Sequence, residues 1–137
     1  MIEAGFVLLV QAGLGSPPLA PGGFAVQLPK DQISPVTPYA WTYRSIVSDP
    51  TYVLEGQDPF TSWEIQLDCH GYTMQNAITL ARAVDVVLRG GYSGVLSDTD
   101  RTRVFGIFRR GPFLDGYSDA NRSFVRTMEY EIQYAQI

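Results

Sequence analysis

Apolar and polar side chains alternate along residues 62–70, which read S-W-E-I-Q-L-D-C-H. A period of two is typical of a β-strand with one buried face and one solvated face. The face expected in the core carries Trp63, Ile65, Leu67 and Cys69. The face expected in solvent carries Glu64, Gln66, Asp68 and His70. We therefore predict a strand at the centre of the chain.

The period changes immediately after this strand. Residues at i, i+3, i+4 and i+7 spacing are apolar, which predicts an amphipathic helix of about four turns. Its apolar stripe is formed by Ala77, Leu80, Ala81, Val84, Val87 and Leu88. The residues expected to face away are Gln75, Asn76, Thr79, Arg82, Asp85 and Arg89. We expect Thr73 to cap the start, Gly90-Gly91 to end the helix, and the stripe to pack on the strand.

The residues before the central strand predict one helix and two further strands. Residues 2–12 form a helix with a buried stripe of Ile2, Phe6, Leu9 and Val10, ended by Gly13 and Gly15. A short strand is expected over 24–28, and an aromatic, β-branched strand over 39–47. Residues 48–60 hold two Asp-Pro pairs and a glycine, so we expect a long connection there.

Two more strands follow the central helix. We expect a loop over 92–100 with a brief strand at 95–96, a strand over 103–110, and a turn-rich excursion over 111–121. Residues 123–135 give the longest strand pattern, with Thr127, Glu129, Glu131 and Gln133 on its polar face. Turn-rich connections suit antiparallel neighbours. Residues 1–137 are therefore expected to form a single α+β domain, a mostly antiparallel β-sheet with two α-helices packed on one face.

Composition narrows the functional classes. The net charge of −4 is too acidic for a generic nucleic-acid binder, which gains affinity by neutralising phosphates. Cys69 is the single cysteine, so an internal disulfide is excluded and a reducing compartment is permitted. The N-terminal residues have no basic region and only a short apolar run, so we expect neither a signal peptide nor a membrane span.

Catalytic and metal-binding patterns are weak. Cys69 and His70 are adjacent on a strand and would point to opposite faces, so we expect a buried structural thiol rather than a catalytic dyad. Asp98 and Asp100 lack the glycine and glutamate of a calcium loop, and 115–122 lacks the terminal carboxylate. No GxGxxG, GxSxG or HExxH motif occurs. We therefore predict no catalytic, cofactor or metal site, and no enzymatic activity.

Arginines gather around one predicted strand. They form either a contact surface for an acidic partner or nucleic-acid backbone, or a solvated strand with carboxylates as partners. Because arginine and aromatic residues are enriched at protein interfaces, we predict seven partner-binding residues. They are Arg101, Arg103, Arg109, Arg110, Tyr52, Phe60 and Phe113.

The whole layout resembles a family of small phage proteins. The chain begins M-I-E-A-G-F-V-L-L-V-Q-A, has Q-L-P-K-D before an aromatic strand, and continues with W-E-I-Q-L-D-C and A-R-A-V-x-x-V-L. It closes with R-x-x-E-Y-E-I-x-Y. This pattern is similar to the tail-completion proteins of long-tailed bacteriophages and gene-transfer agents, over nearly the whole chain.

The resemblance implies a structural role in the virion. A tail terminator forms a ring, typically a hexamer, that caps the tail tube and joins it to the head connector after assembly in the bacterial cytoplasm. Six copies at −4 each would make the ring strongly acidic, and Glu129 and Glu131 are the residues expected to face the lumen. Such a lumen would let the genome DNA pass without specific binding. A head-completion or stopper protein and a small enzyme remain as alternatives.

Overall fold

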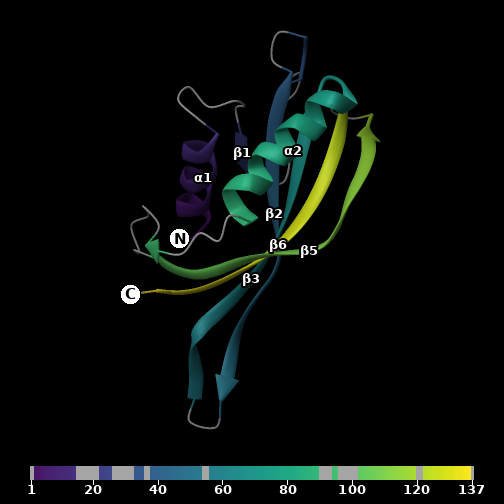
Figure 1. The fold of residues 1–137 in the computed structure, drawn as a ribbon. Helices are drawn as coiled ribbons and strands as arrows, with labels where there is room; N and C mark the ends of the chain where they lie inside the picture. The colour runs from purple at the N-terminus through teal and green to yellow at the C-terminus, as the bar shows by residue number, and fades with distance from the viewer. Residues whose placement is uncertain are drawn as a thin grey trace.

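The computed structural model describes residues 2–14, 22–25, 33–35, 38–53, 56–89, 94–95, 102–119 and 122–136. Within these residues the chain forms two helices and six strands, arranged as Figure 1 shows. In chain order they are α1 (Ile2–Gly13), β1 (Gly22–Ala25), β2 (Tyr39–Val53), β3 (Gly56–Gly71), α2 (Met74–Arg89), β4 (Gly94–Val95), β5 (Thr102–Ser118) and β6 (Ser123–Gln136).

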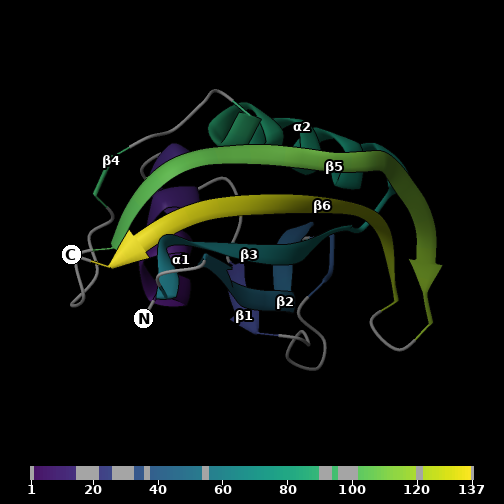
Figure 2. The ribbon, with the colours of Figure 1, turned by 90° about the horizontal axis from the view of Figure 1, so that it is seen from below.

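Four long antiparallel strands make up most of the sheet. The strand order is β1-β2-β3-β6-β5-β4, and only the short β1 joins its neighbour in parallel. β5 and β6 bend together along their length, as Figure 2 shows. The α+β class and the single, mostly antiparallel sheet are confirmed.

Both helices pack on the same face of this sheet (Figure 1). The inward side chains Trp63, Ile65, Leu67 and Cys69 of β3 are all buried, as their alternation predicts. Phe6 of α1 meets Trp41 and Trp63 edge-on, with ring centroids 6.4 and 5.5 Å away. One continuous apolar core therefore joins α1, α2 and the sheet. Neither described helix has the length and apolar character needed to cross a bilayer.

The start of α2 has the predicted cap. The Thr73 hydroxyl accepts a hydrogen bond from the Asn76 backbone N–H at 3.1 Å, and the Asn76 side chain accepts one from the Thr73 N–H at 3.1 Å. Two backbone donors that the helix would leave unpaired are thus satisfied. The stripe residues Ala77, Leu80 and Val84 are fully buried against the sheet. Gly90-Gly91 lies outside the described residues.

The long connection predicted over 48–60 is wrong. β2 continues to Val53 and β3 already begins at Gly56, so the two strands form one extended hairpin. Pro50 and Pro59 lie within these strands. A proline is tolerated in a strand where one side has no hydrogen-bonding neighbour. This part of the hairpin has left both β1 and β6, which explains why the turn signals do not end the strands.

The turn-rich excursion predicted over 111–121 is also largely wrong. β5 runs on to Ser118 and stays paired with β6. The Gly-Pro signal instead marks a bulge between Arg110 and Leu114, where Gly111 has a φ of 74°. The strand predicted over 24–28 is observed at Gly22–Ala25, and residues 26–28 lie outside the described part.

Candidate functional site

The predicted arginine cluster divides between the two faces of the sheet. Arg109 pairs with Tyr130 in register and shares the helix-bearing face, whereas Arg110 pairs with Glu129 on the opposite face. We call this opposite face the open face, because no described helix covers it. Arg103 is exposed, and Arg101 lies outside the described residues. The cluster is therefore not one continuous basic surface.

Arg110 forms ion pairs with two carboxylates on the open face. Glu64 of β3 and Glu131 of β6 stand directly opposite one another, an arrangement in which like charges repel. The Arg110 Nη1 atom lies 2.7 Å from Glu64 Oε1 and 3.5 Å from Glu131 Oε2. The Ser62 hydroxyl also donates to Glu131 at 2.5 Å. These contacts offset the repulsion across three neighbouring strands.

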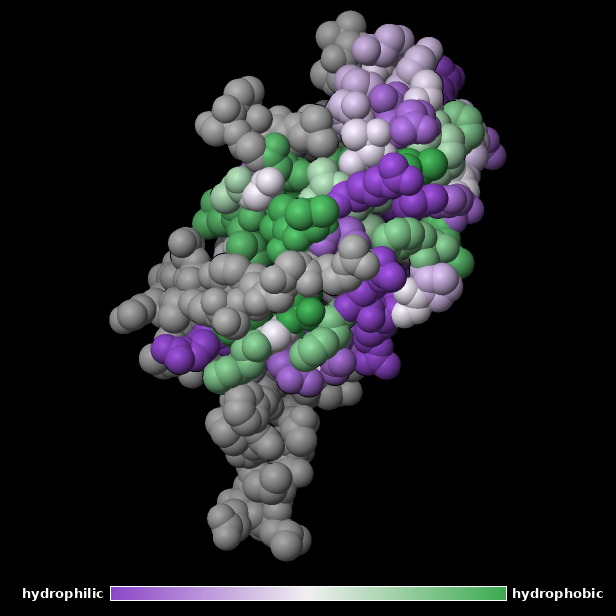
Figure 3. Space-filling model, in the orientation of Figure 1, coloured by the Kyte–Doolittle hydropathy of each residue, from purple (hydrophilic) through white to green (hydrophobic). Residues whose placement is uncertain are grey.

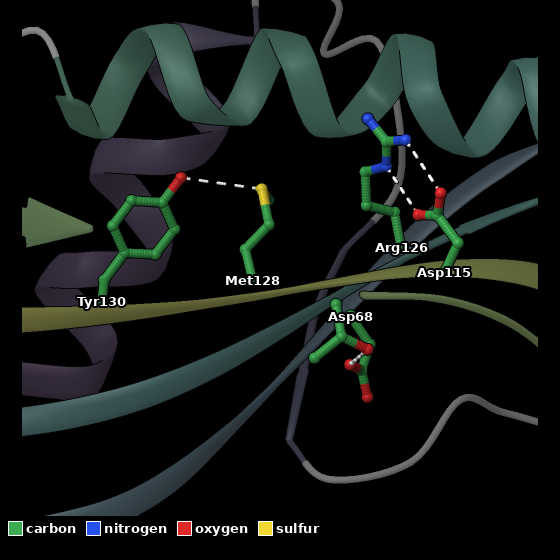
Figure 4. Close-up of polar contacts among 6 residues, drawn as sticks. Asp68, Asp115, Arg126, Met128 and Tyr130 are labelled. Carbon is green, nitrogen blue, oxygen red and sulfur yellow. Dashed lines mark hydrogen bonds and ion pairs between the residues drawn. The ribbon is translucent and has the colours of Figure 1, made fainter. Parts of the chain in front are cut away.

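Asp68 continues the polar face along β3. Its Oδ1 atom accepts hydrogen bonds from the Thr127 hydroxyl at 2.7 Å and the Gln66 amide at 3.2 Å. Figure 4 shows Asp68 pointing away from the helices, whereas Met128 and Tyr130 point toward α2. Glu129, predicted to face a lumen, is exposed on this same open face. The open face is thus a hydrogen-bonded, carboxylate-rich surface.

On the helix-bearing face of the sheet, Asp85 of α2 is buried, so the prediction that it faces solvent is wrong. It lies four residues after Ala81 and three before Leu88, which places it on the buried stripe. The Tyr130 hydroxyl donates to Asp85 Oδ1 at 2.5 Å, and Arg109 Nη1 lies 3.5 Å from Oδ2. Burial, followed by this hydrogen bond, raises the pKa of Tyr130 well above its usual value of 10.0. The spacing to Ala81 and Leu88 was the signal that could have predicted this contact.

Phe113 lies close to two guanidinium groups. The Cζ atoms of Arg109 and Arg126 are 4.6 and 5.0 Å from its ring centroid, within the range of cation–π attraction. Arg126 also donates two hydrogen bonds to Asp115, at 2.7 and 2.9 Å (Figure 4). The hydrogen bond from Arg126 lowers the pKa of Asp115 below its usual 3.8. Phe113 and Arg109 therefore have intramolecular partners, and their role in binding a second protein stays a prediction.

His70 is also buried, which corrects the expectation that it faces solvent. Its Nδ1 atom hydrogen-bonds with the Ser123 hydroxyl at 3.0 Å and its Nε2 atom with the Thr42 hydroxyl at 3.3 Å. Burial lowers the pKa of the imidazole from 6.5, and the smaller opposing effect of Asp68 raises it. Both ring nitrogens are occupied by hydroxyls, which is the arrangement of a structural histidine. Pairing between distant strands creates this contact, so no local pattern could predict it.

Cys69 is fully buried, and this burial raises its thiol pKa, in agreement with the predicted structural thiol. No group of three or more metal-ligating side chains occurs in the part of the chain that the structure describes. The side chains of Tyr52 and Phe60 lie outside it, although their backbones belong to β2 and β3. The remaining candidate features are surfaces that could contact another molecule. They are the carboxylate-rich open face, the exposed apolar residues and the hairpin of β2 and β3.

Comparison with models of known protein families and with curated proteins finds no match.

Proposed function

We propose that this protein is a structural component of a virion, a tail terminator whose copies form a ring that caps the tail tube and joins it to the head connector. The sequence resemblance to tail-completion proteins suggests this role. The α+β fold with a sheet and two helices agrees with a small assembly module. The observation that carries the proposal is a two-stranded part of the sheet that extends beyond its last described neighbouring strand.

That part is the outer end of the β2–β3 hairpin, which we call the ribbon (residues 51–53 and 56–60). β3 pairs with β6 only as far as Thr61, whereas β2 and β3 remain paired to Val53 and Gly56. The ribbon projects away from the helices and the rest of the sheet (Figure 1). A two-stranded hairpin without further support is marginally stable in water, so contact with a second surface would stabilise the ribbon. A neighbouring subunit in an assembly supplies such a surface.

Exposed apolar side chains support the same proposal. Leu8 of α1 and Val86 of α2 are 53% and 70% exposed. Leu114 of β5, which lies on the open face, is 61% exposed. Figure 3 shows hydrophobic residues gathered on and beside α1, on the side of the molecule that carries both helices. Apolar surface of this kind is typical of protein–protein contacts. A ring subunit needs such contacts with two neighbours, the tail tube and the head connector.

The open face suits a channel that passes DNA. Among the described residues its carboxylates, Glu64, Asp68, Glu129 and Glu131, outnumber the arginines that share the face, which are Arg44, Arg103 and Arg110. If this face lines the lumen, phosphate groups meet a net negative surface and do not bind to it. The genome would then slide through the ring without specific contacts.

Deleting the gene from its phage or gene-transfer agent tests this function. Without a terminator, tail tubes should polymerise beyond their normal length, and electron micrographs should show overlong tails without heads. Complementation with the wild-type gene should restore a uniform length. Tails of normal length beside heads that have lost their DNA would contradict a terminator and identify a stopper instead. Unaltered particles would contradict both roles.

A further inference from the structure

Among the described residues, the outer edge of β5 is largely uncovered. β4 pairs with β5 only at Arg103 and Val104, and no other described strand lies along this side up to Ser118. The edge of a sheet offers backbone N–H and C=O groups to another strand. The bulge after Arg110 divides this edge into two stretches, 106–110 and 114–118.

The side chains along this edge are those of an interface. Phe108 and Leu114 are exposed on the open face, and Tyr117 is exposed on the helix-bearing face. Sheet edges that remain free in solution usually carry charges or short strands, which prevent unwanted pairing. β5 carries arginines and a bulge of this kind, but it also spans seventeen residues and exposes large apolar groups on both faces of the sheet. Contact with another strand would bury these groups and pair the backbone.

The ribbon has the length and charge to fill this edge. No described strand lies along the outer side of the preceding β2 residues 47–50. Together with them, the ribbon offers seven β2 residues, 47–53, that extend about 23 Å at the usual rise of a strand, which exceeds the span of 106–110. By sequence, residues 47–61 include Asp49, Glu55 and Asp58 but neither Lys nor Arg. Residues 102–110 include three arginines and no carboxylate. Arg110 already contacts two glutamates, but half of its side chain is exposed. Because its guanidinium has five donors, it can also bind a carboxylate of the ribbon.

We infer that the ribbon of one copy docks along the outer edge of β5 of a second copy, so that the sheets of neighbouring subunits become continuous. This inference rests on the proposed ring and names its subunit contact. The ribbon extends β2 at one side of the sheet, and β5 lies toward the other side. A contact between two different surfaces repeats from subunit to subunit and closes into a ring when the rotation allows it.

Disulfide cross-linking tests this contact. A variant carrying Thr51→Cys in the ribbon and Phe108→Cys in β5 is assembled on tail tubes and then oxidised. Since Cys69 is fully buried with a raised thiol pKa, it does not compete. We expect a ladder of covalent oligomers on a non-reducing gel, ending at the ring. The matched control combines Thr51→Cys with Gln75→Cys, an exposed position at the start of α2, and should give no ladder.

Single variants define the geometry further. Thr51→Cys alone and Phe108→Cys alone should each stay uncross-linked, whereas a mixture of the two should form covalent dimers. Rings in electron micrographs with no more cross-linking than the control would overturn the inference and leave the proposed function intact. Cross-linking between two ribbons would also overturn it, because that contact is symmetric. Absence of any ring from the wild-type protein would overturn both proposals.

Discussion

The hydroxyl of Tyr130 connects the sheet to α2 through a single buried carboxylate, that of Asp85. Arg109 reaches the same carboxylate from β5, so one α2 side chain joins two strands. A buried carboxylate needs such partners, because leaving it unpaired costs more than the hydrogen bond itself contributes. This group therefore fixes the position of α2 over the sheet as well as stabilising it.

Tyr130→Phe should lower the free energy of unfolding by about 1–3 kcal/mol, because the Asp85 carboxylate loses its buried donor. Chemical denaturation measures the change. Tyr134→Phe is the control, since Tyr134 lies on the same face of β6 and the described residues show no hydrogen bond to its hydroxyl. Equal losses in the two variants would show that the hydrogen bond to Asp85 contributes nothing.

His70 should make stability depend on pH. Since burial lowers its folded pKa, the unfolded chain binds a proton more readily as the pH falls. The stability contributed by the neutral imidazole is complete above the unfolded pKa of 6.5 and decreases as the pH falls toward the folded value. The lowered pKa of Asp115 affects stability in a separate pH range, where the stability that its carboxylate contributes decreases as the pH falls below 3.8.

Thermal melts between pH 7.5 and 5 should therefore show a falling melting temperature for the wild-type protein. His70→Gln should melt lower at pH 7.5, because its neighbours Ser123 and Thr42 lose a fitted partner. Its profile should be flatter over the same range, since the titrating group is gone. An unchanged slope in this variant would show that other groups cause the pH dependence.

Among the secondary-structure elements, α2 depends most on its buried stripe. Val84→Asp should unfold the domain, because it places an unpaired charge between α2 and the sheet at a cost of several kcal/mol. Val86→Asp on the outer surface of the same helix should leave folding nearly unchanged, since Val86 is largely exposed. Circular dichroism of both variants checks this, and a folded Val84→Asp protein would contradict the core described here.

The junction between β3 and α2 requires a glycine. A Cβ atom at Gly71 would lie 2.3 Å from the Ala77 backbone nitrogen and 2.7 Å from the Thr73 carbonyl oxygen. Gly71→Ala must therefore displace the first turn of α2, and we expect a loss of about 1–3 kcal/mol. Gly116→Ala, where the added methyl group meets nothing within 4 Å, is the control. Similar melting temperatures for the two variants would contradict this close packing.

The elements that could be predicted are those with a local, repeated pattern. The alternation around Trp63 and the helical stripe through Val84 each encode both an element and its buried face. The ribbon could not be predicted, because Asp-Pro and glycine signals indicate turns locally whereas strand pairing is set by distant residues. For the same reason no local sequence pattern predicts the hydrogen bonds of His70 with Thr42 and Ser123.

Only part of the candidate site follows from the sequence. Strand alternation alone places Arg109 and Arg110 on opposite faces, and the polar row of β6 places Glu129 and Glu131 together. Their ion-pair partners depend on strand order, which periodicity does not encode. The binding roles of the predicted contact residues stay predictions, as does the lumen.

In the molecule as a whole, folding and assembly should be separable. Replacing residues 50–61 with Asn-Gly joins the paired residues Asp49 and Ser62 through a two-residue turn and removes the outer ribbon. The core that begins at Trp63 remains, so the melting temperature should stay within a few degrees of the wild-type value. Ring formation should be lost, as measured by native mass spectrometry in the presence of tail tubes. A shortened protein that still forms rings would show that the ribbon is not a subunit contact.

Cryo-electron microscopy of the wild-type protein mixed with tail tubes tests the proposed assembly most directly. We expect a closed ring of identical copies at one end of each tube, with its subunits in head-to-tail contact. A protein that remains monomeric at high concentration and leaves the tube ends bare would contradict the account.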